Sequence, residues 1–365
     1  MKENNEIVLS ILIISHNQRD LLIRCVESVL KQDLPYSHEI IISDDGSTDG
    51  TWEQIMAYAS KYPELIKGYQ CNSSQFQPNC SSERCGVNKL NAYQHSSGKY
   101  FVNLDADDYL ICEDVYKKSV ELLEEHPECS MCQHRVLHVN DGEDLEKGFS
   151  YFQDIPTGTI YKAAYLIANN NMLDVNPGFV IRRNRSVNME LKLGKYFNDR
   201  SITYLHLLYG DCIWLNSFGY VYVAYRNAIS QYTHYQLDEL SLKNNVDILA
   251  RIQLIPEWAG VFMKYCGIRA VANIYKYRNS NICLLNNSKM TFRDFEGFTF
   301  KYFLKTKRTM FEHIWAWSLR IIFYLIKRVG IAGGPYFYKC LYAMATSYKV
   351  ANIIPLDYWK ENRIK

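Results

Sequence analysis

Two glycine-rich motifs that mark many nucleotide-binding folds are absent from this sequence. No Gly-x-Gly-x-x-Gly opens the first expected helix, and no Gly-x4-Gly-Lys-Ser/Thr occurs in the chain. The first absence disfavours a dinucleotide-binding fold, and the second disfavours a Walker-type phosphate loop. Any phosphate group that the chain binds must therefore be held by something other than a glycine-rich loop.

Signals for secretion and for membrane crossing are also scarce. The polar start Met1–Glu6 leads directly into an apolar run, so we expect no signal peptide. The apolar segment 314–326 is too short, and too interrupted by Arg320, to span a bilayer. The 11 cysteines are scattered, which favours a reducing compartment over a disulfide framework. We therefore expect a cytoplasmic protein.

One group of cysteines raises zinc binding as an alternative. Cys129 and Cys132 are two residues apart, and His134, Cys80 and Cys85 are nearby in the sequence. The spacing between the cysteine pairs fits no common zinc pattern. We expect these cysteines to be packed in the interior or exposed at the surface rather than to bind a metal.

The net charge is small but unevenly distributed. It is +2 overall, yet residues 289–365 carry 14 Lys and Arg against 5 Asp and Glu, which leaves 27 Lys and Arg against 34 Asp and Glu elsewhere. The acidic body disfavours nucleic acid as a partner. The basic tail favours an anionic surface as its partner, such as a membrane.

The body of the chain has the composition and the pattern of a globular α/β protein. Its 365 residues are 48% apolar and 22% charged, enough for one large or two ordinary domains. Ile7–Ser15 and Glu39–Ser43 are apolar runs of strand length, and apolar residues at helical spacing follow each, over 21–30 and 52–62. This β-α-β-α order predicts a doubly wound sheet.

The rest of the body is assigned by the same patterns. We expect a loop over 69–85, a helix over 88–97 that ends at Gly98, a strand over 99–104, a helix over 113–125, a strand over 131–139, a loop over 141–158, a helix over 159–169, a strand over 177–183, a helix over 202–208, a strand over 219–226 and largely helical structure over 238–287.

Three of the expected strands end in polar residues. In open α/β sheets, ligands bind outside the carboxyl ends of the strands. Polar groups gathered at one sheet edge therefore predict a nucleotide pocket better than three unrelated turns would. The residues concerned are Ser15, His16, Asn17, Asp44, Asp45 and Asp105–Asp108.

Asp105, Asp107 and Asp108 form the densest group of carboxylates in this set. Neighbouring carboxylates repel one another and are costly to desolvate. A hard divalent cation relieves both problems and also binds phosphate oxygens. The alternative is an Asp-rich turn that begins the next helix, and the polar ends of the upstream strands favour a metal–diphosphate site over that alternative.

Four stretches of the chain carry a resemblance to a known enzyme family. Residues 10–17, 41–49 and 98–108 resemble family 2 glycosyltransferases of the bacterial surface-polysaccharide type, and 198–226 does so more loosely. These are inverting enzymes with the GT-A fold. The resemblance covers roughly residues 7–235.

The resemblance implies a Rossmann-like, mostly parallel central sheet flanked by helices. We expect a GT-A domain over 1–235, with a nucleotide-sugar half over about 1–110 and an acceptor half over about 111–235. Residues 236–300 would form a helical extension, and 301–365 would form basic, aromatic-rich helices.

The resemblance also implies roles for the polar residues at the strand ends. Asp105 would meet the ribose or the metal, Asp107 would bind the Mn²⁺ or Mg²⁺ ion that bridges the diphosphate, and Asp108 would extend this cluster. The residues that would hold the nucleotide are Ser15, His16, Asn17, Asp44 or Asp45, and Asp105.

The catalytic base of the family is an acidic residue at the head of a late helix. Asp199, followed by Gly210 and by Tyr225–Arg226, fits this spacing better than its rival Asp211. An Asp at a helix start is often only a cap. A histidine after the Tyr-Arg pair completes the metal site in some related enzymes, and His234 is the candidate, with an ordinary surface histidine as the alternative.

The resulting expectation is metal-dependent, inverting transfer of a sugar from a nucleotide-diphosphate sugar, with UDP as the carrier, to a glycan or lipid-linked hydroxyl. A nucleotidyltransferase and a non-catalytic nucleotide-sugar-binding subunit are the alternatives. The apolar segment 314–326, with its basic flanks, would lie in the membrane interface on the cytoplasmic side. The alternative for this segment is a helix packed on the body.

Overall fold

The computed structural model describes the greater part of the first 224 residues and two short strands beyond them. The ranges are 6–76, 81–150, 155–163, 178–194, 197, 199–207, 209–224, 282–283 and 289–290. The chain divides into two compact units, of which the first comprises Met1–Ala163, Asn171–Tyr232 and Asn362–Lys365. In the second unit, β10 (Ile282–Cys283) and β11 (Lys289–Met290) pair antiparallel.

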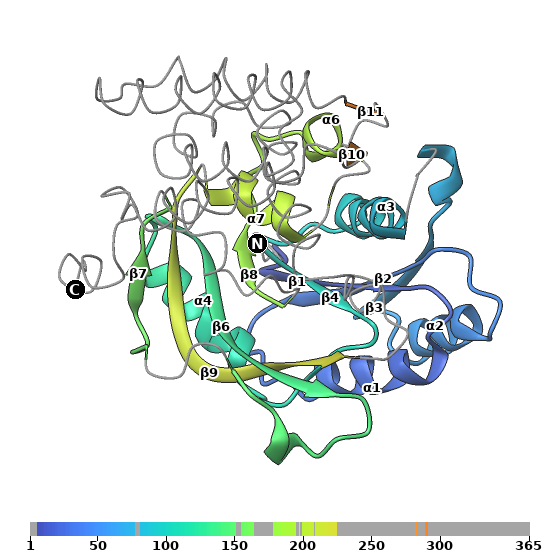
Figure 1. Cartoon of the computed structure of the whole chain (residues 1–365), viewed down its shortest axis with the longest axis horizontal. Coiled ribbons are helices and arrows are strands. Elements are labelled where there is room, and N and C mark those ends of the chain that lie inside the picture. The colour runs from blue at the N-terminus through green and yellow to red at the C-terminus, as the bar shows by residue number, and fades with distance from the viewer. Residues whose placement is uncertain are drawn as a thin grey trace, which may run out of the picture. The chain divides into compact units, whose positions relative to one another are not determined.

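The first unit is built on a nine-stranded mixed sheet (Figure 1). The strands are β1 (Leu9–Ser15), β2 (His38–Asp44), β3 (Ile66–Gln70), β4 (Tyr100–Asp105), β5 (Tyr109–Leu110), β6 (Cys129–Asn140), β7 (Thr159–Tyr161), β8 (Val180–Arg182) and β9 (Asp211–Ala224). Their order is β3-β2-β1-β4-β8-β6-β9-β5, and β7 also pairs with β9.

Helices cover both faces of this sheet. In Figure 1, α1 and α2 lie on one side of β1, β2 and β4, and α3 lies on the other. The described helices of the first unit are α1 (Arg19–Leu30), α2 (Thr51–Lys61), α3 (Ser81–Gln94), α4 (Val115–Glu125), α6 (Met189–Lys192) and α7 (Asp199–Leu207), with short 3-10 turns at Ser73–Phe76 and Leu145–Lys147. The α/β architecture with flanking helices that the family resemblance implies is confirmed. The strands β3-β2-β1-β4 are parallel, as expected, whereas β8, β5 and β7 pair antiparallel with their neighbours.

The central strands are parallel and in register, so their carboxyl ends meet at one edge. Ser15 of β1 pairs with Asp44 of β2, and Ile14 pairs with Asp105 of β4. The expectation that the polar strand ends gather at one place is therefore confirmed. Each polar group described below begins from one of these ends.

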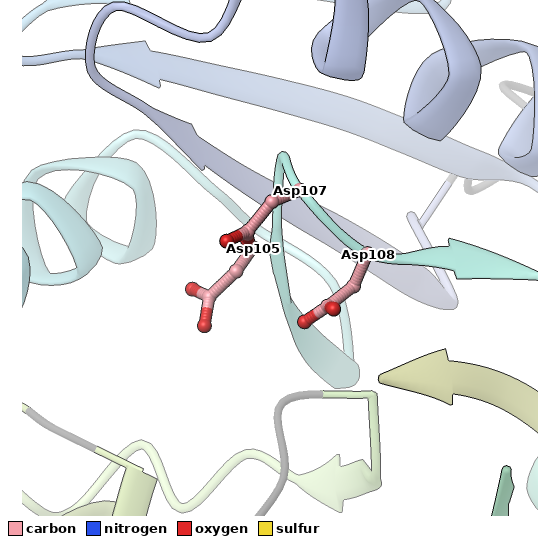
Figure 2. A group of neighbouring side chains, drawn as sticks. All are labelled: Asp105, Asp107 and Asp108. Carbon is pink, nitrogen blue, oxygen red and sulfur yellow. The ribbon is translucent and has the colours of Figure 1, made fainter. Parts of the chain in front are cut away.

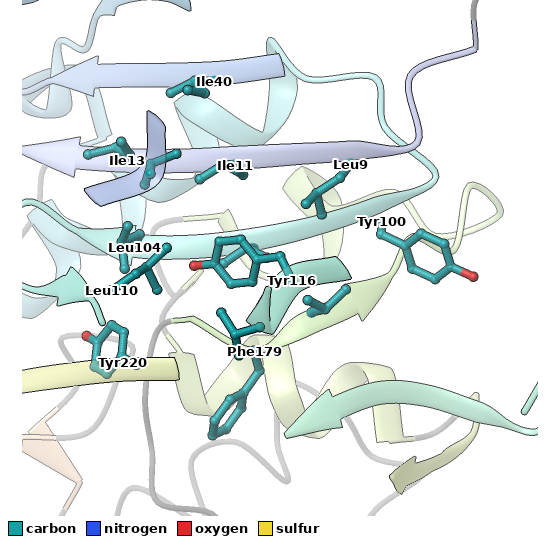
Figure 3. Close-up of a cluster of buried hydrophobic side chains, with 14 of the residues drawn as sticks. Leu9, Ile11, Ile13, Ile40, Tyr100, Leu104, Leu110, Tyr116, Phe179 and Tyr220 are labelled. Carbon is teal, nitrogen blue, oxygen red and sulfur yellow. The ribbon is translucent and has the colours of Figure 1, made fainter. Parts of the chain in front are cut away.

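The core explains why β1 occupies the centre of the parallel part of the sheet. All seven residues of β1 are buried, as the near-continuous apolar run predicted for a strand covered on both faces. Figure 3 shows Leu9, Ile11 and Ile13 beside Tyr100 and Leu104 of the neighbouring strand. Burying an aliphatic side chain of this size contributes roughly 1.5–3 kcal/mol, so β1 is a rigid base for the loop that follows it.

One expected element is wrong, and another has different bounds. The helix expected over 159–169 begins instead as the strand β7, because Thr159, Ile160 and Tyr161 pair with β9; residues 164–169 lie outside the described residues. The helix expected over 88–97 is α3, which begins at Ser81 and ends at Gln94. The loop expected over 69–85 therefore contains the end of β3 and the first turns of α3.

Gly98 is a close-packing position rather than a helix cap. A β-carbon at Gly98 would come within 2.7 Å of the Ser10 nitrogen and of the Tyr100 oxygen. A side chain there would push β1 and β4 apart. Gly98 thus allows the two central strands to approach each other.

Cys129 and Cys132 are packed in the interior, and Cys80 of the same candidate group lies outside the described residues. Cys129 and Cys132 are free, buried residues of β6. Burial raises the pKa of each thiol to about 12, so the thiolate needed for metal binding is disfavoured. Among the described residues, the acidic and metal-ligating side chains cluster only at Asp105, Asp107 and Asp108. The interpretation of Cys129 and Cys132 as packing residues is confirmed.

Candidate functional site

The loop Asp105–Asp108 leaves the end of β4 as a tight turn held on two sides. The Asp108 amide donates to the Asp105 carbonyl at 3.0 Å, and the Ala106 amide donates to the Ile14 carbonyl of β1 at 3.0 Å. From α1, the Arg24 guanidinium donates to the Asp107 carbonyl at 2.8 Å. These bonds fix the backbone from which the carboxylates project.

The three carboxylates of this loop lie close together. One oxygen from each of Asp105, Asp107 and Asp108 lies within 4.8 Å of the others, and Figure 2 shows Asp105 and Asp107 side by side on one side of the loop. Burial, opposed in part by Lys89, raises the pKa of Asp105 to about 7, and burial also raises the pKa of Asp107. Hard oxygen donors at this spacing fit a Mg²⁺ or Mn²⁺ ion.

Asp108 differs from the other two because its carboxylate is bound by β9. The Tyr220 hydroxyl donates to Asp108 Oδ2, and the Val223 amide donates to Oδ1 at 3.2 Å. The residue is 2% exposed, and burial raises the pKa of its carboxyl group well above the ordinary value. Asp108 therefore connects the loop to β9. Asp105 and Asp107, whose carboxylates are not bound in this way by β9, are the better placed pair for a metal.

A buried lysine joins the loop to the head of α7. The Lys89 ammonium, on α3, contacts Asp105 Oδ1 at 3.1 Å and also contacts Asp199 Oδ1. The side chain of Lys89 is 1% exposed. Burial alone would lower its pKa, but the two carboxylates outweigh that effect and hold the pKa well above its usual range. Lys89 is thus a charged group between two predicted site residues, Asp105 and Asp199.

Asp199 and Asp211 occupy very different surroundings. Asp199 begins α7 and reaches the site through Lys89. Asp211 begins β9, where its carboxylate pairs with Lys162 at 2.8 Å and accepts the Ala163 amide at 2.9 Å. The β9 residues that reach Asp108 lie toward the other end of that strand. The structure brings Asp199, and not Asp211, to the carboxylate cluster.

A small cavity lies against Asp199. Its polar lining comes from Asn103, Asp199 and Thr203, and its apolar lining includes Phe179 and Ile202. The Asn103 Oδ1 atom is buried and has no hydrogen-bond partner among the described residues. The cavity beside Asp199 is thus lined by two kinds of hydrogen-bond acceptor, the Asp199 carboxylate and the Asn103 side-chain oxygen.

The loops that follow β1 and β2 are hydrogen-bonded to each other. Asp44 is fully buried and accepts the Ser15 hydroxyl at 3.2 Å and the Ser47 amide at 2.9 Å. Asn17 adopts a left-handed backbone conformation with φ 53°, and its backbone N–H donates to the Ser47 hydroxyl at 2.8 Å. His16 Nδ1 bonds the Asp45 carbonyl at 2.8 Å. All five nucleotide-site candidates from these loops therefore lie in one network.

Arg84 is a member of this network that the sequence patterns did not identify. Its guanidinium binds Asp45 Oδ2 through Nε at 3.0 Å and through Nη2 at 2.7 Å. Asp45 is 7% exposed, whereas Arg84 is 43% exposed. Arg84 and Lys89 both belong to α3, whose first turns were expected to be loop. Positions 84 and 89 are five residues apart, about 140° around a helix, so helical spacing alone would not have placed both side chains at the site.

Other expected site residues lie outside the described residues. His234 and the Tyr225–Arg226 pair belong to this group, as does the basic tail from residue 301 onward. Of the helices that the structure does describe, none is long and apolar enough to cross a membrane.

Comparison with known proteins identifies the domain that carries this site. Residues 10–189 match the family model described as glycosyl transferase family 2. The chain belongs to glycosyltransferase family 2. The matched range of this glycosyltransferase includes Lys89 and Asp105–Asp108, and Asp199 follows it.

Individual relatives of this glycosyltransferase match shorter parts of it. An uncharacterized protein of Mycobacterium tuberculosis is 27% identical over 176 residues, which are 47% of this chain and 48% of that protein. The Escherichia coli UDP-Glc:alpha-D-GlcNAc-diphosphoundecaprenol beta-1,3-glucosyltransferase WfaP is 34% identical over 105 residues, which are 28% of this chain and 37% of WfaP. The chain thus spans about half the length, or less, of these curated relatives.

Among solved structures, S. aureus TarS 1-349 in complex with UDP-GlcNAc aligns with a TM-score of 0.47 and 15% identity. The alignment covers 81% of this chain and 89% of that chain.

Proposed function

We propose that this glycosyltransferase moves a sugar from a UDP-sugar to a hydroxyl of a glycan or lipid-linked glycan, with inversion at the anomeric carbon. The observation that carries the proposal is the meeting of two groups at one sheet edge. Asp105 and Asp107 form a candidate divalent-metal site, and Asp199 is joined to that site through Lys89. A glycosyl transfer needs charge stabilisation on the donor and a base near the acceptor, and these groups can supply both.

The chain's own residues divide the work on the donor. Asp105 and Asp107 would hold a Mn²⁺ or Mg²⁺ ion, which when bound stabilises the negative charge on a leaving diphosphate. The network of Ser15, Asp44 and Asp45 would bind the nucleotide base and ribose beside them. Arg84 orients the Asp45 carboxylate through its two bonds.

Asp199 would act on the acceptor as general base. Its carboxylate would take the proton from the acceptor hydroxyl, whose oxygen then attacks the anomeric carbon from the face opposite the leaving group. The carboxylate lines a small cavity together with Asn103, whose Oδ1 atom has no partner among the described residues.

The donor and acceptor classes are suggested by a relative. WfaP is named for transfer from UDP-glucose to a diphosphoundecaprenol-linked sugar. A UDP-sugar donor and a lipid-linked acceptor are the corresponding proposal for this protein.

A thermal-shift screen of nucleotide sugars tests the proposal. A ligand that binds only the native state raises the melting temperature. At 100 times its Kd it adds about 2.7 kcal/mol to the free energy of unfolding. We expect UDP and at least one UDP-sugar to raise the melting temperature of the full chain in MnCl₂, and to raise it less in EDTA. Equal melting temperatures with and without every nucleotide sugar would contradict the proposal.

We further propose that the basic tail binds the cytoplasmic membrane surface at its inner face, where a lipid-linked acceptor would lie. Lys301, Lys305 and Lys327 flank an apolar segment that contains Trp315 and Trp317. Basic residues near anionic lipid contribute about 1 kcal/mol each.

A flotation assay tests the role of the tail. Vesicles with anionic lipid should carry the full chain to the top of a gradient and should carry a chain ending before Lys301 much less. Equal flotation of the two chains would assign the tail to packing on the body instead.

A further inference from the structure

Lys89 contacts both parts of the proposed site, the metal-binding carboxylate Asp105 and the proposed base Asp199. It lies on α3, while its two carboxylate partners belong to β4 and α7, far apart in the sequence. One ammonium nitrogen contacts both Asp105 and Asp199, and its side chain is 1% exposed. A buried charge of this kind is retained only where partners compensate for its desolvation.

The contact has a consequence for the position of Asp199. Asp105 is fixed by the β4 backbone, which is paired with β1 in register. Asp199 is the first residue of α7, at a helix end, where backbone order is ordinarily weakest. Because a single nitrogen binds both carboxylates, the distance between the base and the donor side of the site depends on Lys89.

We propose that Lys89 is a positioning residue, which holds the Asp199 carboxylate at a fixed place relative to Asp105 and thereby sets the rate of the transfer step. This inference rests on the proposed function, in which Asp199 is the base. A misplacement of a reacting group by about 1 Å can reduce the rate about 10²-fold. The contrasting role is charge neutralisation for folding alone, in which Lys89 would stabilise the domain without affecting the base.

The test measures turnover and donor binding separately in the full chain. UDP release from UDP-glucose in MnCl₂ reports turnover, and calorimetric titration with UDP and MnCl₂ reports binding on the donor side. We expect Lys89→Met to reduce turnover about 10²-fold while UDP still binds, because the substitution removes no metal ligand. Lys89→Arg, which retains a cation with hydrogen-bond donors, should recover a large part of the loss.

A double-mutant cycle separates positioning from folding. If Lys89 acts through Asp199, then adding Lys89→Met to Asp199→Asn should reduce turnover by no more than about twofold. Losses that multiply, or a Lys89→Met variant with unchanged turnover, would overturn the inference. If Lys89→Met does not fold, Lys89→Gln takes its place in the same cycle.

Lys162→Met is the matched control. Lys162, which follows β7, pairs with Asp211 at the start of β9, away from the cluster. Like Lys89, it pairs with an Asp at the start of an element, but it has one carboxylate partner and is partly exposed. Its substitution should leave UDP release unchanged.

Hydrogen exchange decides the inference even if UDP-glucose is not a donor. The amides of α7 should exchange faster in Lys89→Met than in Lys162→Met or in the unmodified chain, without any substrate present. Unchanged exchange over α7 would overturn the positioning role. Failure of the unmodified chain to bind UDP with MnCl₂ would instead count against the proposed function.

Discussion

Asp199→Asn should reduce sugar transfer by about 10²–10⁴-fold, which is the usual contribution of a general base. The amide has nearly the same size as the carboxylate, but it cannot accept a proton from the acceptor hydroxyl. Binding of UDP with MnCl₂ should persist, because Asp105 and Asp107 are unchanged. Initial rates of UDP release and a calorimetric titration with UDP, both on the same protein preparation, would measure the two effects.

Asp211→Asn is the informative comparison for this variant. Asp211 is paired with Lys162 and bonded to the Ala163 amide at the start of β9. Its substitution should affect stability more than turnover. Full turnover in Asp199→Asn together with lost turnover in Asp211→Asn would reverse the assignment of the base.

Asp107→Ala should abolish metal-dependent nucleotide binding. Loss of an outer partner of a metal site already weakens metal affinity by about 10- to 100-fold, so loss of a direct ligand should weaken UDP binding in MnCl₂ by at least about 100-fold. The backbone of the loop should survive, since Arg24 donates to the main-chain carbonyl of Asp107, which the substitution retains. Titration of UDP in MnCl₂ and in EDTA would show whether the metal-dependent part of the affinity is lost.

Asp20→Ala provides the control for Asp107→Ala. The side chain of Asp20 is 92% exposed on the first turn of α1, so its removal changes the net charge equally without entering the site. UDP should bind this variant as it binds the unmodified chain. Equal metal-dependent binding by Asp107→Ala and Asp20→Ala would rule out Asp107 as a metal ligand.

The parts of the site that strands provide were predictable from the sequence. Ile7–Ser15 and Glu39–Ser43 are mostly apolar, which is typical of strands buried on both faces. Parallel strands in one sheet end at one edge, so the gathering of Ser15, Asp44 and Asp105 followed from local pattern and topology alone. The pairing of Ser15 with Asp44 and of Ile14 with Asp105 bears this out.

The parts that α3 provides were not predictable in the same way. Asn88 and Lys89 are buried on α3 although both are polar, so the buried face of this helix is not a simple apolar stripe. Its buried face is selected by partners from other elements, since Lys89 binds Asp105 and Asp199, and Asn88 bonds the Ser43 hydroxyl. Such partners cannot be read from spacing along one segment.

The choice between Asp199 and Asp211 shows the same limit. Both residues lie at the start of an element, where an Asp is favoured as a cap or turn residue. Local pattern does not separate them, but the three-dimensional arrangement does, because Lys89 approaches Asp199 and Lys162 approaches Asp211. The family spacing favoured Asp199, and the neighbourhood of Asp199 adds independent support.

A crystal structure of the full chain grown with UDP and MnCl₂ tests the central claim most directly. We expect an anomalous manganese peak in contact with the carboxylates of Asp105 or Asp107 and with diphosphate oxygens of UDP. Bound UDP whose diphosphate lies away from both carboxylates, or a manganese peak elsewhere in the domain, would contradict the account.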